Sequence, residues 1–172
     1  QSHMHQGYWG VEKTMEILDR FSRFNLPIHF TETTIISGQL MPPEIMDLND
    51  YQVSDWPSTP EGEERQALEV VTHYKTLFNH PLVEGITWWD LSDGHWLNAP
   101  AGLLRKDGTS KPAYEELLKL IKGDWWVAPT RLATDENGCI HFSGYPGKYE
   151  ITCGNTSRTF DLTQPDQVLE VS

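Results

Sequence analysis

The chain has 172 residues, 38% of them hydrophobic, which is enough for one domain, or for one domain with a small appendage, and for a core of its own. Thirteen basic residues against twenty-five acidic residues give a formal net charge of −12, which would repel a phosphate backbone, so nucleic acid is not expected as a partner. No apolar run reaches the length of about eighteen residues that a membrane span needs, so no membrane partner is expected. The first residues carry no secretory signal, which a mature or truncated chain would have lost.

The first predicted elements are a helix and a short strand. Residues 11–24 combine charged positions with apolar residues at helical spacing, which predicts an amphipathic helix. The run LPIHFT, residues 26–31, predicts a buried strand that ends just before Glu32. The segment from Thr33 to Pro60 has no sustained periodicity, and a loop of that length is usually functional. The predicted apolar face of the helix consists of Val11, Met15, Leu18 and Phe21.

A second helix, a second strand and a third helix follow. Thr59 is a typical N-cap residue and Pro60 suits the first helical position, so a helix is predicted from here to Phe78. The run LVEGITWW, residues 82–89, predicts a strand, and residues 110–122 predict the third helix. The second helix would face inward with Ala67, Val70, Val71, Tyr74, Leu77 and Phe78, and the third with Tyr114, Leu117, Leu118 and Ile121.

This alternation of helices and strands predicts an α/β fold with a parallel sheet. After Trp126 the pattern changes to strand-like runs separated by turn signals around residues 136–138, 145–147 and 154–155, which predicts a small antiparallel β appendage. Cys139 and Cys153 lie in this appendage, where either a disulfide or two free thiols would be consistent with the sequence.

Glu32 is the candidate functional residue, because ligands of parallel α/β folds bind at the carboxyl ends of the strands. The next strand ends in the polar, tryptophan-rich segment WWDLSDGHW, residues 88–96. A carboxylate beside exposed indoles suits a carbohydrate, which offers C–H faces for stacking and hydroxyls for hydrogen bonds. The alternative is that Glu32 is a solvated strand end and that the tryptophans pack a loop onto the core.

Four segments, in this order along the chain, resemble motifs of the glycoside hydrolase family 10 xylanases. QSH at residues 1–3 resembles the end of the sixth barrel strand, and LPIHFTET at 26–33 resembles the seventh strand. HPLVEGITWWDLSDGHW at 80–96 resembles the eighth strand and its loop, and GLLRKDGTSKPAYEELL at 102–118 resembles the segment that follows. The resemblance implies that residues 1–126 are the C-terminal part of a (β/α)8 TIM barrel, strands six to eight with their helices, and that residues 127–172 are the appendage.

The resemblance also implies a role for each matching residue in a retaining endo-1,4-β-xylanase. Glu32 matches the catalytic nucleophile, and His3 matches the histidine that hydrogen-bonds it. Gln1 matches a neighbouring residue at the sugar-binding end, while Trp89 and Trp96 match the two indoles that wall the subsite of the reacting sugar. The implied partner is xylan or xylo-oligosaccharides, and the implied location is extracellular.

The chain departs from the family pattern in three places. Thr34 stands where the family has an aspartate that helps to hold the histidine, and Trp88 and Asp90 stand where the family has smaller residues. The family's general acid/base glutamate lies on the fourth strand in a motif that this sequence lacks, and a whole barrel takes about 250 residues. Hydrolysis would therefore need barrel strands supplied by another segment or polypeptide.

Two alternatives stay open from the sequence. A barrel part of this size would expose strand edges and an apolar interior, so it would self-associate and bind xylan without hydrolysis. A carbohydrate-binding module whose binding face is the β appendage is the other alternative. No cofactor and no metal site is predicted, because a clustered calcium-binding loop is missing. For four further histidines the expected place is a loop without a catalytic role: His5, His73, His80 and His141.

Overall fold

The computed structural model describes residues 1–164 and 167–168, and the chain divides into two units, Gln1–Trp125 and a C-terminal unit that starts at Trp126. The predicted boundary lies one residue later. The last part of the predicted appendage, residues 165–166 and 169–172, lies outside the described residues.

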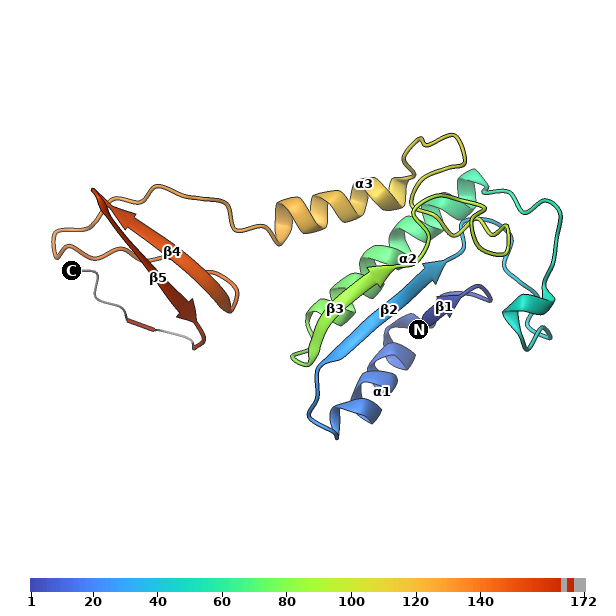
Figure 1. Ribbon diagram of the computed structural model, residues 1–172, viewed down its shortest axis with the longest axis horizontal. Helices are drawn as coiled ribbons and strands as arrows, with labels where there is room; N and C mark the ends of the chain where they lie inside the picture. Colours follow the sequence, from blue (N-terminus) through green and yellow to red (C-terminus); the bar gives the residue numbers. More distant parts are fainter. Residues whose placement is uncertain (165–166, 169–172) are drawn as a thin grey trace. The chain divides into compact units, whose positions relative to one another are not determined.

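The first unit is built on a sheet of three parallel strands, which Figure 1 shows side by side in the order β1 (Ser2–Met4), β2 (Ile28–Ile35) and β3 (Val83–Trp88). Helix α1 (Gly10–Ser22) connects β1 to β2, and helix α2 (Pro60–Phe78) connects β2 to β3. Helix α3 (Pro112–Lys119) follows β3 and continues into a π-helical segment, η2 (Leu120–Asp124). The predicted α/β alternation with a parallel sheet is thus confirmed.

The core lies between one face of the sheet and the helices. One apolar cluster joins Leu18 of α1, Phe30 of β2 and Leu77 of α2. A larger cluster joins β1 and β2 to α2 and α3. The second cluster contains Met4, Ile35, Ala67, Val70, Tyr74, Leu103, Ala113, Leu117 and Leu120.

The long segment between β2 and α2 is well anchored. Its short 3-10 helix, η1 (Leu48–Asp50), is capped by Asp47, and a third apolar cluster packs beneath the segment around Trp56 and Met41. At its end the Thr59 hydroxyl caps α2 by accepting from the Gly62 amide at 3.0 Å. Gly62 has no room for a side chain, since a Cβ there would lie 2.0 Å from the Ser37 carbonyl oxygen.

Strand β2 does not end before Glu32 as predicted. It continues to Ile35, because Thr33, Thr34 and Ile35 pair with the three residues of β1 and are buried. Glu32 therefore lies within the strand, near its carboxyl end. The β-branched residues Thr33, Thr34 and Ile35 are compatible with a strand, but the charged Glu32 interrupts the apolar run on which the predicted strand end was based.

Several predicted inward positions are exposed. Val11 and Phe21 of α1 are 47% and 52% exposed, because α1 follows the edge strand β1 and has a neighbouring helix on one side only. Leu118 and Ile121 are also exposed, since α3 buries Ala113 and Leu117 instead and the chain then turns into η2.

The face of the sheet that the helices leave open is polar and not apolar, contrary to expectation. The exposed residues of β2 and β3 are His29, Thr31, Glu84 and Thr87, and the imidazole of His29 lies 3.8 Å from the Glu84 carboxylate. Self-association through an apolar barrel interior therefore finds no support in these residues.

Two histidines that were assigned to loops are fully buried. His73 lies on α2 with its ring edge-on to Tyr8 and Phe30, and His5 follows β1 among aromatic rings. Neither imidazole has a hydrogen-bond partner among the described residues. Burial lowers the pKa of each to about 4.

The C-terminal unit contains an antiparallel hairpin of β4 (Gly147–Cys153) and β5 (Thr156–Leu162). The turn between the strands falls on Gly154, whose φ of 60° suits glycine, and Asn155. The rings of Phe142, Tyr149 and Phe160 pack together. Both cysteines are exposed free thiols, so the structure has no Cys139–Cys153 disulfide.

Among the described residues, no helix combines the length and apolar character that a membrane crossing requires.

The buried His73 predicts an acid-sensitive fold. Because its folded-state pKa of about 4 lies below the usual 6.5, the unfolded state binds more protons between these values. Stability is therefore lost as the pH falls from about 6.5 to about 4, by about 3 kcal/mol for this one group. We expect His73→Phe to reduce that loss, measured as the free energy of unfolding in urea at several pH values. His141→Gln, at an exposed position, is the control and should leave the pH dependence of stability unchanged. An unchanged pH dependence in His73→Phe would contradict the conclusion that the buried His73 causes the loss of stability at low pH.

Candidate active site

A register shift in β2 creates the site. Phe30 pairs with Ile86 and Thr33 with Trp88, so three steps along β2 match two along β3. In a regular strand Phe30 and Glu32 would point to the same face. The extra residue lets Phe30 pack toward the helices while Glu32 points to the other side, and bulges of this kind commonly re-aim a side chain beside an active site.

The Glu32 carboxylate is held at both oxygens by residues of the neighbouring N-terminal segment. His3 Nε2 donates to Oε2 at 3.0 Å, and Gln1 Nε2 donates to Oε1 at 2.9 Å. His3 Nδ1 in turn lies 3.2 Å from the hydroxyl of Thr34, two residues beyond Glu32 on β2. The parallel pairing of β1 with β2 sets this geometry, since it places His3 directly opposite Thr34.

These hydrogen bonds favour the charged carboxylate. The His3 bond, and after it the Gln1 bond, holds the pKa of Glu32 below its usual value. Glu32 therefore stays ionised in moderately acidic solution, as a nucleophile must.

Two indoles stand beside the carboxylate and its histidine. The Trp96 ring lies 4.3 Å from the His3 ring, centroid to centroid, and the Trp89 ring lies edge-on to His3 at 6.1 Å. Trp89 is 47% exposed, so a ligand can stack on it. The structure thus brings together all five residues that the sequence predicted for the site: Gln1, His3, Glu32, Trp89 and Trp96.

Two further titratable residues, His5 and Asp90, lie beside these five residues, and the sequence did not predict either of them as part of the site. The His5 ring lies behind the site, 5.2 Å from the Trp96 ring and 5.8 Å from the ring of Trp56 in the long loop. Asp90 is 6% exposed, and burial raises the pKa of its carboxyl group. The position of Asp90 directly after Trp89 could have indicated that it lies near the site. No sequence feature indicated this for His5, because its aromatic neighbours come from distant segments.

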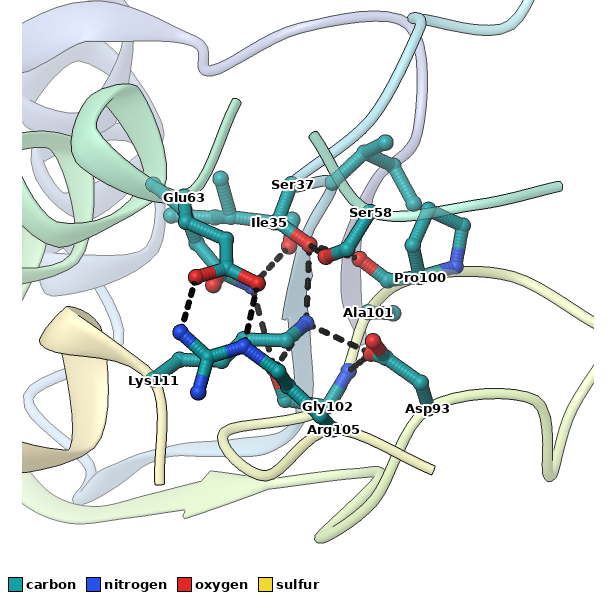
Figure 2. Close-up of polar contacts among 12 residues, drawn as sticks. Ile35, Ser37, Ser58, Glu63, Asp93, Pro100, Ala101, Gly102, Arg105 and Lys111 are labelled. Atoms are coloured by element: carbon teal, nitrogen blue, oxygen red, sulfur yellow. Dashed lines mark hydrogen bonds and ion pairs between the residues drawn. The ribbon is translucent and has the colours of Figure 1, made fainter. Parts of the chain in front are cut away.

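A buried lysine, Lys111, joins the loop after β3, which carries both indoles, to the loop after β2, and Figure 2 shows its polar contacts. The Lys111 ammonium is fully buried and donates to the Ser37 hydroxyl at 2.8 Å, to Asp93 Oδ1 at 2.6 Å and to the Gly102 carbonyl at 2.9 Å. Ser37 begins the loop after β2, and Asp93 lies in the loop after β3 between Trp89 and Trp96. One cation therefore holds both loops against the segment before α3.

Further polar contacts extend this cluster to α2. Arg105 binds the Glu63 carboxylate with two N–H groups, at 2.9 and 2.5 Å, and the buried Gln66 amide donates to the Ile35 carbonyl at 2.7 Å (Figure 2). The carboxyl end of β2 is thereby fixed to the helix beneath it.

Within the part of the chain that the structure describes, no group of three or more histidine, cysteine, aspartate or glutamate side chains is placed to hold a metal ion.

An ionised carboxylate between two hydrogen-bond donors, flanked by indoles at the carboxyl ends of parallel strands, is an arrangement typical of enzymes that act on carbohydrates. The family model described as glycosyl hydrolase family 10 matches residues 1–120. The chain belongs to glycosyl hydrolase family 10, of which it contains part of the domain.

Two curated relatives match almost the whole chain. The sequence is 29% identical over 162 residues to the anti-sigma-I factor RsgI6 of Acetivibrio thermocellus, covering 91% of this chain and 18% of that protein. It is 27% identical over 161 residues to endo-1,4-beta-xylanase 1 of Arabidopsis thaliana, covering 90% of this chain and 14% of that protein. The chain thus spans less than a fifth of either relative. Because the first unit ends at residue 125, both matches include part of the C-terminal unit.

Solved xylanases share the fold. Xylanase 10B from Thermotoga petrophila, solved with xylobiose, has a TM-score of 0.52 at 18% identity and is matched over 72% of this chain and 35% of its own. A thermostable mutant of Xyn10A from Cellvibrio japonicus has a TM-score of 0.53 at 21% identity, over 72% of this chain and 38% of its own. The fold of the matched region is therefore that of part of a TIM-barrel xylanase.

The buried lysine predicts a large effect on stability. Lys111→Met leaves the buried Asp93 carboxylate without its cation, so we expect the free energy of unfolding to fall by about 3 kcal/mol or more. Adding Asp93→Asn should recover part of the loss, because no unpaired buried charge then remains. Lys119→Met is the matched control, since Lys119 pairs with Glu116 in solvent, where an ion pair contributes little to stability. Equal changes in the free energy of unfolding for Lys111→Met and Lys119→Met would show that the buried contacts of Lys111 do not stabilise the fold.

Proposed function

We propose that this chain carries the nucleophile half of the active site of a retaining endo-1,4-β-xylanase. The observation that carries the proposal is the Glu32 carboxylate, held by His3 at 3.0 Å and by Gln1 at 2.9 Å beside Trp96 and Trp89. Family membership and the named xylanase relative support the reaction class.

In the proposed reaction, the sugar at the cleavage point lies against the two indoles with its anomeric carbon near Glu32. A Glu32 oxygen attacks that carbon as the bond to the leaving oxygen breaks, and a second carboxyl group protonates the leaving oxygen. The glycosyl ester formed on Glu32 is then hydrolysed by a water molecule that the second group deprotonates. Retaining enzymes place the two carboxyl groups about 5 to 5.5 Å apart.

The second carboxyl group is proposed to come from barrel strands outside these 172 residues. In this proposal the three strands correspond to strands six to eight of the barrel, so the open edges of β1 and β3 would each receive a neighbouring strand. The polar residues His29, Thr31, Glu84 and Thr87 would then line the barrel interior.

The proposed substrate is xylan or a xylo-oligosaccharide, in keeping with the xylobiose bound by the Thermotoga petrophila enzyme. A neutral polysaccharide is compatible with the net charge of −12, which would repel an acidic polymer. We also propose that the protein acts outside the cell, where its polymeric substrate lies.

A second candidate function is a barrel that binds xylan without cleaving it. The relative with 29% identity is named an anti-sigma-I factor and not a xylanase. Thr34 and Asp90, which depart from the family pattern beside the nucleophile, are the residues that would account for such a loss. Xylan binding without release of reducing sugar from the complete barrel would favour this candidate.

The direct test removes the proposed nucleophile. We expect Glu32→Gln in the complete barrel to lower kcat on xylan by at least about 10³-fold while the circular dichroism spectrum is retained, because the amide cannot form the glycosyl ester. Glu64→Gln is the matched control, since Glu64 is an exposed glutamate on α2, the helix behind the sheet, and its replacement should keep full activity. Wild-type turnover by Glu32→Gln would remove Glu32 from the mechanism.

A second test uses the pH dependence of hydrolysis. Because His3 is the first cause of the lowered pKa of Glu32, His3→Ala should raise that pKa and so shift the acid limb of the kcat/KM profile to higher pH. Gln1→Ala should shift the limb in the same direction by less. His141→Ala, at an exposed position of the C-terminal unit, should leave the limb where it is. An unshifted limb in His3→Ala would contradict the proposed support of Glu32 by His3.

A further inference from the structure

The residue that contacts His3 on the side away from Glu32 is a threonine, Thr34, whose hydroxyl lies 3.2 Å from the second ring nitrogen, Nδ1. Glu32 is ionised and can only accept, so the hydrogen of the 3.0 Å contact must sit on His3 Nε2. His3 Nδ1 then either accepts a hydrogen bond, in the neutral ring, or donates one, in the charged ring. Its partner, Thr34 Oγ1 at 3.2 Å, can serve either form.

The burial of Thr34 decides between these forms. Thr34 has no exposed surface, and a buried hydroxyl left without an acceptor loses free energy. His3 Nδ1 is the acceptor within reach of this hydroxyl among the described residues. The Thr34 hydrogen is therefore satisfied only if it points at Nδ1, which requires Nδ1 to be unprotonated.

We propose that Thr34 is a positioning residue that keeps His3 as the neutral tautomer with its proton on Nε2. Thr34 donates to Nδ1, Nε2 donates to Glu32 Oε2, and Gln1 donates to Oε1. The nucleophile is then held by uncharged donors, and not by an ion pair. The kinetic consequences of this proposal depend on the function proposed above, whereas the state of the ring does not.

The other titratable groups that face His3 do not supply an acceptor for a second ring proton. Glu32 on β2 uses Nε2, and His5, in the turn after β1, is a neutral ring whose centroid lies 6.1 Å from that of His3. Asp90, after β3, interacts with His3 through space and shares no hydrogen bond with it among the described contacts. Trp89 and Trp96 carry no charge. Thr34 thus stands as the group that sets the state of Nδ1.

The first experiment reads the ring itself in the complete, uniformly ¹⁵N-labelled barrel. At about pH 8 the His3 signals, identified by their loss in His3→Asn, should show a protonated Nε2 and an unprotonated Nδ1, as the contacts with Glu32 and Thr34 require. In Thr34→Asp the new carboxylate can only accept, so both His3 nitrogens should be protonated at the same pH. A wild-type ring that carries two protons, or a single proton on Nδ1, would overturn the proposal.

The second experiment measures the effect on hydrolysis. Thr34→Val removes the donor at nearly constant volume and should lower kcat/KM about tenfold, which is the scale of one lost hydrogen bond, and should displace the acid limb of the pH profile. Thr34→Ser should restore kcat/KM to within about threefold of wild type, because the hydroxyl returns. Thr33→Val is the matched control, since its hydroxyl bonds Ser2 at 2.8 Å and not His3, and its pH profile should be unchanged.

The two experiments separate the failure of this inference from failure of the proposed function. If Glu32→Gln stays active, the proposed function fails and the ¹⁵N result still decides the tautomer. If Glu32→Gln is inactive but Thr34→Val and Thr33→Val share the wild-type pH profile, the role of Thr34 fails while the nucleophile stands.

Discussion

The pairing of β1 with β2, together with the one extra residue that β2 contains between Phe30 and Thr33, is the constraint on which the site depends. A sheet with helices on one face needs its apolar side chains on that face, and Phe30 satisfies this need by packing on Leu18 and Leu77. Without the extra residue, Glu32 would point into the same apolar layer, where an ionised carboxylate is costly. The bulge therefore reconciles a stable core with a charge on the opposite face.

The site also requires that the loops after β2 and β3 keep a fixed conformation, and the polar contacts of Lys111 stabilise both loops. Trp89 and Trp96 lie on or beside the loop after β3. If a ligand had to order this loop, the loss of conformational entropy would weaken binding. Lys111 joins that loop to the one after β2 through Asp93 and Ser37, in an environment without solvent exposure. Such a buried charge is stable only with its full set of partners, so the cluster favours a single arrangement of the two loops.

The surroundings of Glu32 are suited to a group that must be ionised yet reactive. The hydrogen bonds from His3 and Gln1 hold the pKa of Glu32 below its usual value, so the carboxylate is ionised and one of its oxygens can attack carbon. The exposed, polar face of the sheet beside it, with His29 and Glu84, is consistent with a surface that lines a barrel in the complete protein. The sequence matches to both curated relatives extend beyond the barrel part into the C-terminal unit.

What the sequence by itself determined is the alternation of helices and strands, and it also predicted the five residues that the structure brings together around Glu32. Hydrophobic periodicity and capping residues act locally, and motif residues keep their order along the chain, so Thr59 and Pro60 at the start of α2 could be predicted. Only the tertiary structure decided the face on which Glu32 lies, the end of β2 at Ile35 and the burial of His5, His73 and Lys111. The physical reason is that strand register, and the burial of a polar side chain, depend on partners contributed by distant segments, which no local pattern encodes.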